Sequence, residues 1–347
     1  MRFLTTASYY GTGSSAVTDL LSEYSDVASL PSCFECRIAH DMFGLSDLEY
    51  YLVDNYHRHN SSVAVKMFER LLKLYGLDEC LKMENYPYYL GPDFKRYCEE
   101  YIKRLAPLSY EGGSHLDIYM KSDAFIIWLK IKERIFHSLY RLKVSQDNDD
   151  AWRYKKESPY ERACKNEKSY ITYPRDFFLS VTRDFTRNIF SYANKENRDF
   201  LLVDQLVPAT NTMRYCRYFD SIKVVAIDRD PRDLYYLEKY YWKGSIVPSE
   251  PEMFVNWYKT TRAHKKYELG EENYVLRIQF EDLVFKYDLV VSEIEKFTGL
   301  KKENHVDYKK HFNPQKSKDN IGKWKNDKKE YSNIRKIEQL LPELCLK

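Results

Sequence analysis

RFLTTASYYGTGSSAVTDLL, residues 2–21, is the stretch of sequence that decides the fold. The run from Arg2 to Ala7 joins Phe3 and Leu4 to threonines, which is typical of a buried strand. A turn rich in Gly, Ser and Thr follows at 9–15. Apolar residues then recur at helical spacing, at Val17, Leu20, Leu21 and Tyr24. The stretch therefore predicts a strand, a turn and an amphipathic helix in that order.

This order of elements is suited to binding an anion. The first N–H groups of a helix have no partner within the helix, and the helix dipole favours negative charge there. Glycines let the backbone approach a phosphate closely, and the Thr12, Ser14 and Ser15 hydroxyls add donors. The same residues also fit a tight turn whose serine caps the helix, and the stretch alone does not separate the two.

Composition sets limits on the class of protein. The 347 residues are enough for a full core, and a formal net charge of +3 gives no argument for nucleic acid or an anionic membrane as partner. Seven cysteines show no metal-ligand spacing and favour free thiols in a reducing compartment. With a strand at the very start and no apolar run of about 18 residues, we expect a cytoplasmic protein without a transmembrane segment.

Short apolar runs alternate with helical patterns along the chain. Strands are predicted at 2–7, 32–38, 200–203, 224–227 and 274–280, and helices at 46–57, 63–75, 94–105, 117–142, 176–192, 234–241 and 289–297. This alternation favours an α/β fold with a central parallel sheet covered by helices on both faces. We expect a single domain over 1–347, with a mainly helical insertion at 40–198. The polar stretch 143–174 fits a lid over the site or a plain surface excursion.

Two further motifs carry charge suited to phosphate. In IDRDPRDLYY, Arg229 follows an apolar strand, where an open α/β sheet presents its ligand crevice. Its forked donors suit phosphate oxygens, whereas Arg232 and Asp233 favour a surface pair at a helix start. In KSKDNIGKWKND, residues 316–327, lysines surround Gly322 and Trp324. That segment fits a solvated basic loop or a loop covering a nucleotide phosphate.

Together and in this order, these motifs resemble the sulfotransferases that use 3'-phosphoadenosine-5'-phosphosulfate (PAPS). The turn at 11–15 is similar to that family's 5'-phosphosulfate loop, VVAIDRDPRDLYY to its 3'-phosphate strand and helix, and IGKWKN to its C-terminal loop. The stretch 274–300, with FEDLV and FTGL, is similar to the segment that links the last two. The resemblance covers residues 2–25 and about 199–327, and implies a P-loop NTPase-like sulfotransferase fold with acceptor-binding insertions at 40–198.

The resemblance implies roles for particular residues. Gly11, Thr12, Gly13, Ser14 and Ser15 are expected to hold the 5'-phosphosulfate. Arg229 is expected to bind the 3'-phosphate, with Tyr236 in place of a family serine whose position holds Leu237. Cofactor contacts from the C-terminal loop are expected at Lys318, Asn320, Gly322, Lys323 and Trp324. The donor is then PAPS and the product adenosine 3',5'-bisphosphate, with no metal implied.

The first loop departs from the family pattern. A Lys or Arg usually offsets charge on the leaving phosphate, and Gly11 stands in its place here. Either another cation replaces it, with Arg37, Lys66 and Arg153 as candidates, or hydroxyls and helix N–H groups suffice.

The base that takes the acceptor's proton has three candidates. Carbohydrate-directed family members often use a Glu on the strand after the first helix, which points to Glu35. Members acting on small phenols or alcohols tend to use a His, for which His115 and then His40 are candidates. The expected acceptor is a hydroxyl of a carbohydrate or glycolipid.

Two other functions remain open. Residues 11–16 match GxGxxA after a strand, so a dinucleotide-dependent NAD(P) oxidoreductase is possible, with Asp26 or Glu35 as its ribose carboxylate. Gly11 and Leu237 also allow a nucleotide-binding relative without transfer activity. A nucleotide kinase fits poorly, because the loop lacks the GK[ST] pair.

Overall fold

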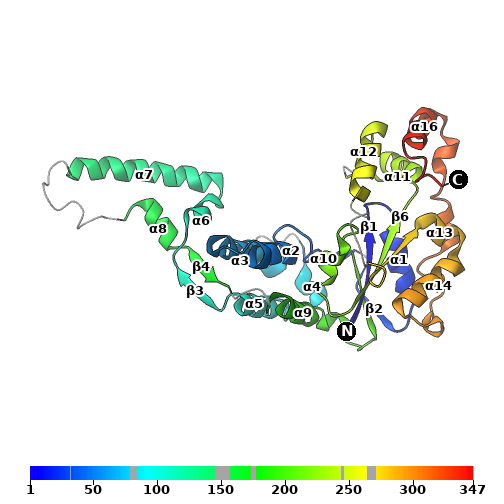
Figure 1. Ribbon diagram of the computed structural model, residues 1–347, viewed down its shortest axis with the longest axis horizontal. Helices are drawn as coiled ribbons and strands as arrows, with labels where there is room; N and C mark the ends of the chain where they lie inside the picture. Colours follow the sequence, from blue (N-terminus) through cyan, green and yellow to red (C-terminus); the bar gives the residue numbers. More distant parts are fainter. Residues whose placement is uncertain are drawn as a thin grey trace.

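The computed structural model describes residues 1–31, 33–78, 84–144, 157–172, 177–243, 246–263 and 271–346. The molecule is elongated: a body built around a sheet carries helices at both of its faces, and an arm of helices reaches away from it (Figure 1). The C-terminal helices lie at the end of the molecule opposite to the arm.

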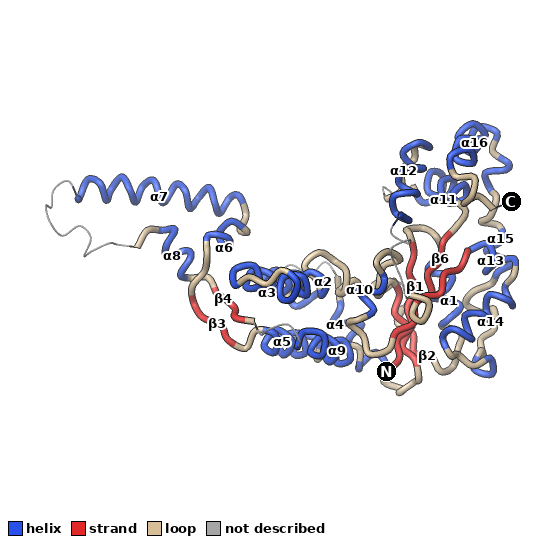
Figure 2. Tube along the Cα trace, viewed as in Figure 1, coloured by secondary structure: helices blue, strands red, loops and turns tan. Residues whose placement is uncertain are grey.

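The body contains a five-stranded sheet in the order β2-β5-β1-β6-β7 (Figure 2). Its strands are β1 (Arg2–Ser8), β2 (Val27–Ser29), β5 (Phe200–Asp204), β6 (Ile222–Asp228) and β7 (Val275–Gln279). All four pairings are parallel. The predicted class, α/β with a central parallel sheet flanked by helices, is confirmed.

Side chains of the central strands alternate between two buried clusters, as the twofold period of a strand requires. Phe3 joins the cluster under α3 (Arg58–Leu72), α5 (Phe94–Leu105) and α9 (Phe178–Ile189). Leu4 joins the cluster under α1 (Ser14–Leu21), α13 (Phe280–Phe285) and α14 (Tyr287–Thr298). Along β6 the same alternation places Val224 in the first cluster and Val225 in the second. Burial on both faces explains why these strands read as continuous apolar runs.

The helices and the hairpin have the following bounds. Before β5 they are α1 (Ser14–Leu21), α2 (Leu45–Glu49), η1 (Tyr50–Asp54), α3 (Arg58–Leu72), η2 (Lys73–Leu77), α4 (Tyr86–Leu90), α5 (Phe94–Leu105), β3 (Leu108–Glu111), α6 (His115–Tyr119), α7 (Asp123–Val144), α8 (Pro159–Lys165), β4 (Lys168–Ile171), α9 (Phe178–Ile189) and η4 (Ser191–Asn194). After β5 they are α10 (Thr212–Cys216), α11 (Pro231–Leu237), η5 (Glu238–Trp242), α12 (Pro251–Arg262), α13 (Phe280–Phe285), α14 (Tyr287–Thr298), η7 (Lys302–Asn304), α15 (Pro314–Lys318), η8 (Lys323–Asn326), η9 (Lys328–Glu330) and α16 (Tyr331–Leu340).

The strand predicted at 32–38 is wrong. The second strand of the sheet is β2, and of the described residues 33–38 only Glu35 forms an isolated parallel bridge, to Asp204. Phe34, Cys36 and Ile38 are nevertheless buried alternately with their neighbours. The segment is thus an extended chain that packs its apolar side chains without a strand ladder, and periodicity alone cannot tell the two apart.

The single helix predicted at 117–142 is also divided. It consists of α6 and α7, and the chain turns between them at 120–122. Ser122 accepts a hydrogen bond from the Phe125 backbone N–H at 3.3 Å, so its side chain caps the start of α7. The polar stretch 143–174, expected to be a lid over the site or a surface excursion, includes α8 and β4; residues 145–156 and 173–174 lie outside the described residues.

Candidate functional site

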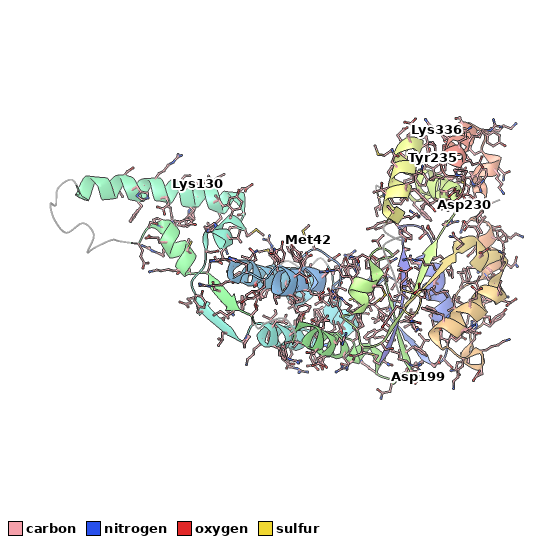
Figure 3. The ribbon with its side chains drawn as sticks, viewed as in Figure 1. Met42, Lys130, Asp199, Asp230, Tyr235 and Lys336 are labelled. Carbon is pink, nitrogen blue, oxygen red and sulfur yellow. The ribbon has the colours of Figure 1, made fainter. Side chains whose placement is uncertain are left out.

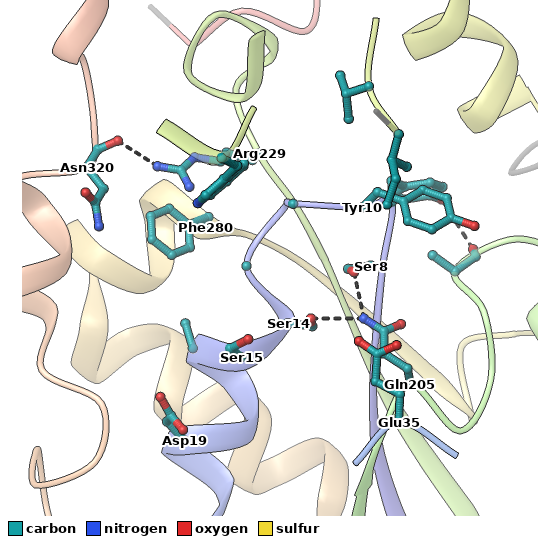
Figure 4. Close-up of a pocket in the computed structure, with 18 of the residues that line it drawn as sticks. Ser8, Tyr10, Ser14, Ser15, Asp19, Glu35, Gln205, Arg229, Phe280 and Asn320 are labelled. Atoms are coloured by element: carbon teal, nitrogen blue, oxygen red, sulfur yellow. Dashed lines mark hydrogen bonds between the residues drawn. The ribbon is translucent and has the colours of Figure 1, made fainter. Parts of the chain in front are cut away.

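A cleft of about 1290 Å³ lies at the carboxyl edge of the sheet (Figure 4). The carboxyl ends of four strands and the segments after them line it, through Ser8 at the end of β1, Gln205 after β5, Arg229 after β6 and Phe280 after β7. Open parallel sheets bind their ligands at this edge, outside the carboxyl ends of the strands. The cleft is therefore positioned by the topology itself, and its volume is sufficient for a nucleotide and a second substrate.

The Gly-rich turn forms one wall of the cleft. Gly11 and Gly13 have φ values of 68° and 111°, in the left-handed region that favours glycine. A Cβ on Gly13 would lie 2.7 Å from the Phe280 ring, so the loop also needs glycine for its close packing. α1 begins at Ser14, and its first backbone N–H groups lack intrahelical partners at the edge of the cleft.

The hydroxyls of this loop have different functions. Thr12 is fully buried; it donates to the Ile227 carbonyl oxygen at 2.7 Å and accepts from the Tyr9 N–H at 3.2 Å. Thr12 thus fastens the loop to β6 and does not line the cleft. Ser14 and Ser15 do line it, together with Gly11 and Gly13. Four of the five predicted loop residues are therefore in position to contact a ligand.

Gln205 is a functional candidate that sequence reasoning missed. Its side-chain amide donates to Ser8 Oγ at 2.8 Å and to Ser14 Oγ at 2.9 Å, and so connects the end of β5 to both ends of the turn (Figure 4). Both serine oxygens accept from this amide, which leaves each O–H free to donate to a ligand. The available signal was its place directly after the apolar strand FLLVD, at the carboxyl edge.

Arg229 also lines the cleft, where the Phe280 ring lies against both it and the turn, and it is only 3% exposed. Its Nη2 donates to the Asn320 carbonyl oxygen at 2.7 Å, and its guanidinium lies 4.3 Å from the centre of the Phe280 ring. Its Nε is buried and has no hydrogen-bond partner among the described residues. Burial lowers the pKa of Arg229, against the opposing effect of Asp233, Glu281 and Asp230, yet a guanidinium stays charged at neutral pH.

A neighbouring arginine shows how unusual this environment is. Arg262, from α12, is 9% exposed and donates to both carboxylate oxygens of Asp228, at 2.9 and 2.6 Å. Asp228 directly precedes Arg229, but its carboxylate faces Arg262. Arg229 keeps a carbonyl oxygen and an aromatic ring as partners, and no ion pair joins it to the described residues. A buried charge that no carboxylate contacts directly is costly, and an anionic ligand in contact with it lowers that cost.

The C-terminal motif divides between the cleft and its support. Asn320 lines the cleft, as do the neighbouring Lys316 and Ser317. The Gly322 N–H donates to Asp233 at 2.7 Å, and the Trp324 ring lies 4.7 Å below the Arg232 guanidinium. These contacts hold the motif against α11.

The remaining predicted cofactor residues lie outside the lining of the cleft. Lys323 Nζ stands 4.1 Å from the Tyr241 ring, and Lys318 is exposed beside Phe285. The Tyr236 hydroxyl donates to Asp327 at 3.2 Å and so faces the C-terminal segment. Arg232 does not pair with Asp233, as the sequence suggested, but with Asp230 and Glu338, both at 2.6 Å.

The other end of the cleft holds titratable side chains from the segment after β2. Glu35, Arg37, His40 and Asp41 all line it. Arg37 Nη1 lies 3.8 Å from Glu35 Oε2, and Arg37 also pairs with Asp41 at 3.5 Å and Glu84 at 2.8 Å. The bridge between Glu35 and Asp204 places the Glu35 carboxylate next to Gln205, and therefore beside the turn. Two of the three candidate bases, Glu35 and His40, therefore line this end of the cleft.

His40 is held as a neutral imidazole. Burial is the largest effect on the pKa of His40 and lowers it, against the pull of Asp41 and a hydrogen bond to the Leu206 backbone. Its Nδ1 is buried and has no partner among the described residues. A neutral imidazole with an unused ring nitrogen can accept a proton, so His40 is a second candidate base at this end.

His115 does not join the site. It is the first residue of α6, exposed, in the arm that reaches away from the sheet (Figure 1). Lys66 is also in that region, where it pairs with the buried carboxylate of Asp117. Arg153 lies outside the described residues. Of the two proposed substitutes for the missing loop cation that the structure describes, Arg37 lines the cleft and Lys66 does not; Lys309 and Lys310, which sequence reasoning overlooked, also line it.

A buried carboxyl lies directly under this end of the cleft. Asp204 is 3% exposed and accepts a hydrogen bond from the Thr6 hydroxyl. Burial raises the pKa of Asp204 to about 6, and the negative charge of Glu35 adds to the increase.

Neither a family model nor a curated protein matches the sequence. Among the helices in the described ranges, none has both the length and the apolar character needed to cross a membrane.

Proposed function

We propose that the protein is a sulfotransferase that moves the sulfuryl group of PAPS to a hydroxyl of a carbohydrate or glycolipid. One observation carries the proposal: Arg229 is buried at the carboxyl edge of the sheet with an unpartnered Nε and no ion pair to the described residues. The cleft thus holds an anion site apart from the turn and helix start at 11–15. A donor with a phosphosulfate at one end and a separate 3'-phosphate at the other needs two such sites.

The positions of the lining residues support the following reaction. The acceptor oxygen forms a bond to sulfur while the bond between sulfur and the 5'-phosphate oxygen breaks, and adenosine 3',5'-bisphosphate leaves. The hydroxyl's proton passes to Glu35, next to the turn. The N–H groups at the start of α1 and the Ser14 hydroxyl stabilise charge on the leaving phosphate. The exposed rings of Tyr10 and Trp242 line the cleft and suit the apolar face of a sugar.

The strand order favours this function over a dinucleotide-dependent oxidoreductase. In the dinucleotide-binding fold the second strand lies beside the first and carries the ribose carboxylate at its carboxyl end. Here β5 separates β1 from β2. Asp26 precedes β2 and therefore lies at the amino edge, away from the cleft. Asp26 is thus excluded as the ribose carboxylate, and Glu35, the other candidate, lines the cleft from a segment beside β5 and not beside β1.

A nucleotide-binding protein without transfer activity is the second candidate. The observation in its favour is that Arg37, the cleft cation nearest in role to the missing loop lysine, is already paired with Glu35, Asp41 and Glu84. Binding of the bisphosphate without turnover of PAPS on any acceptor, or on water, would support it.

The test compares two ligands that differ in one phosphate. Adenosine 3',5'-bisphosphate should raise the melting temperature at lower concentration than adenosine 5'-phosphate does, with NAD(H) and ATP as further comparisons. Arg229→Met keeps the apolar stem against Phe280 and removes the charge. It should cut bisphosphate affinity about 10–100-fold and leave 5'-phosphate affinity nearly unchanged, because a hydrogen bond to a charged group contributes about 1.5–3 kcal/mol.

Two results would contradict the assignment. One is a bisphosphate affinity that Arg229→Met does not change; the other is a wild-type response to NAD(H) alone. The melting temperature of the ligand-free variant serves as the folding control, and we expect it to stay close to that of the wild type, because the substitution removes a buried charge that forms no direct ion pair and keeps the stem packed on Phe280.

A further inference from the structure

α7 presents a row of apolar side chains to solvent. Ile127, Ile131, Ile135 and Leu139 recur every four residues, and Trp128 stands beside them. Their exposed fractions range from 47% to 60%. A contiguous apolar surface of this kind on a soluble body marks a contact site. The helix is 22 residues long, which corresponds to about 33 Å.

The opposite face of α7 is already occupied. Leu129 is 4% exposed, and Glu133 accepts hydrogen bonds from the Ser158 hydroxyl at 2.6 Å and the Tyr160 N–H at 2.7 Å. These contacts attach α7 to the start of α8. The exposed row is therefore a second apolar face, which the described residues of the arm do not cover.

Basic side chains border this face on both sides. At 100° per residue, Lys130 and Arg134 lie on one edge of the row, and Lys132 lies on the other. All three are exposed, and Figure 3 shows Lys130 on the outer part of the arm. Lys132 Nζ lies 3.8 Å from the centre of the Trp128 ring, so a cation and an amphipathic ring share one edge.

We infer that α7 lies in the surface of an anionic lipid bilayer, with its apolar row among the acyl chains and its basic edges at the headgroups. An apolar stripe with Trp, bordered by Lys and Arg, is the pattern of an interfacial helix. A second copy of the chain fits less well, because pairing two such faces brings basic edges together. From Ala124 to Leu139 the sequence has one carboxylate, Glu133, and α8 engages it. The inference does not depend on sulfuryl transfer.

The test is co-sedimentation of the full chain with vesicles of phosphatidylcholine, with and without phosphatidylglycerol, in the absence of nucleotide. We expect binding to the vesicles that contain phosphatidylglycerol, weakened by salt. Ile131→Glu should reduce it at least about tenfold, since an apolar side chain leaves the lipid. Lys130→Gln should reduce it about fivefold. Leu289→Glu, at an equally exposed apolar position on α14 (59%), is the matched control and should bind as wild type does.

The inference is overturned if the wild type does not bind the anionic vesicles, or if Ile131→Glu and Leu289→Glu bind alike. Sedimentation velocity without lipid tests the alternative directly: a dimer that Ile131→Glu disrupts, together with absent vesicle binding, would assign the face to a second copy. The substituted side chains are exposed, so unchanged melting temperatures verify that the variants are folded.

Discussion

In the cleft a charged side chain is buried, whereas on the arm apolar side chains are exposed. Arg229 lies under the edge of the sheet without an ion pair to the described residues, while Ile131 and its neighbours face solvent along α7. Each arrangement lowers the stability of the isolated chain relative to one with ordinary burial, and each is relieved by a partner of matching chemistry. Buried charges without a direct partner and exposed apolar faces are expected at functional sites. The first is the basis for proposing an anion in the cleft, and the second for proposing lipid at the arm.

The largest expected effect is on catalysis in the cleft. Glu35→Gln should lower kcat for sulfuryl transfer by about 10²–10⁴-fold, since it removes the proton acceptor beside the turn. Bisphosphate affinity should stay within about twofold of wild type, because Glu35 is not part of either anion site. Initial rates with PAPS and a panel of simple glycans, with water as the reference acceptor, measure both.

His40→Gln is the discriminating control for Glu35. Because burial lowers the pKa of His40, its imidazole is neutral at pH 7 and would charge only in more acidic solution. If His40 were the base, this variant would show the larger loss of kcat, and the wild-type rate would fall on the acid side of the ordinary His pKa. Equal and small losses of kcat in both variants would exclude this end of the cleft as the location of the base.

An intermediate effect is expected on stability under the cleft. Burial raises the pKa of Asp204 to about 6, so the folded protein holds this proton more tightly than the unfolded chain does. The stabilisation is complete below about pH 4 and is lost as pH rises through about 6, which amounts to roughly 2–3 kcal/mol. Asp204→Asn should reduce the fall in unfolding free energy across this range, as measured by urea titration at several pH values.

The remaining slope has identifiable sources. Burial also raises the pKa of Asp233 to about 6 and that of Glu281 to about 7, so Asp204→Asn should flatten the curve without removing its slope. Asp199→Asn serves as control, since that carboxylate is exposed and pairs with an exposed Arg2. An unchanged slope in Asp204→Asn would mean that this carboxyl is ionised in the folded protein at pH 4–6.

The parts of the fold that could be predicted from sequence are those where local pattern and burial agree. β5 and β6 contain the apolar runs FLLV and VVAI, β1 and β7 join apolar residues to a few polar ones, and α5 has the bounds that its spacing predicted. β2 was missed because three residues at a sheet edge carry little signal, and CFECRI imitated a strand because its alternate side chains are buried. Glycine spacing identified the turn, since its backbone needs φ > 0.

The rest of the site depends on tertiary packing. Gln205 donates a hydrogen bond to Ser8, nearly two hundred residues away in the sequence. Lys309 and Lys310, which line the cleft, belong to the segment that follows α14. His115 was a candidate base from the sequence because no local pattern indicates that the insertion places α6 far from the sheet. Thr12 matched the loop pattern, but its hydroxyl is bonded to the Ile227 carbonyl, which only the strand pairing could reveal.

The smallest expected effect is on the free energy of unfolding, and it compares the exposed and buried faces of α7. Ile131→Glu should change the free energy of unfolding by no more than about 0.5 kcal/mol, because its side chain loses no packing. Leu129→Ala, two residues away on the face toward α8, should cost about 2–4 kcal/mol of local stability. Since the arm can open without the sheet, amide hydrogen exchange within 123–139 is the measurement that resolves both. Similar protection losses in the two variants would show that the exposed row is packed in solution, and would remove the apolar face on which membrane binding depends.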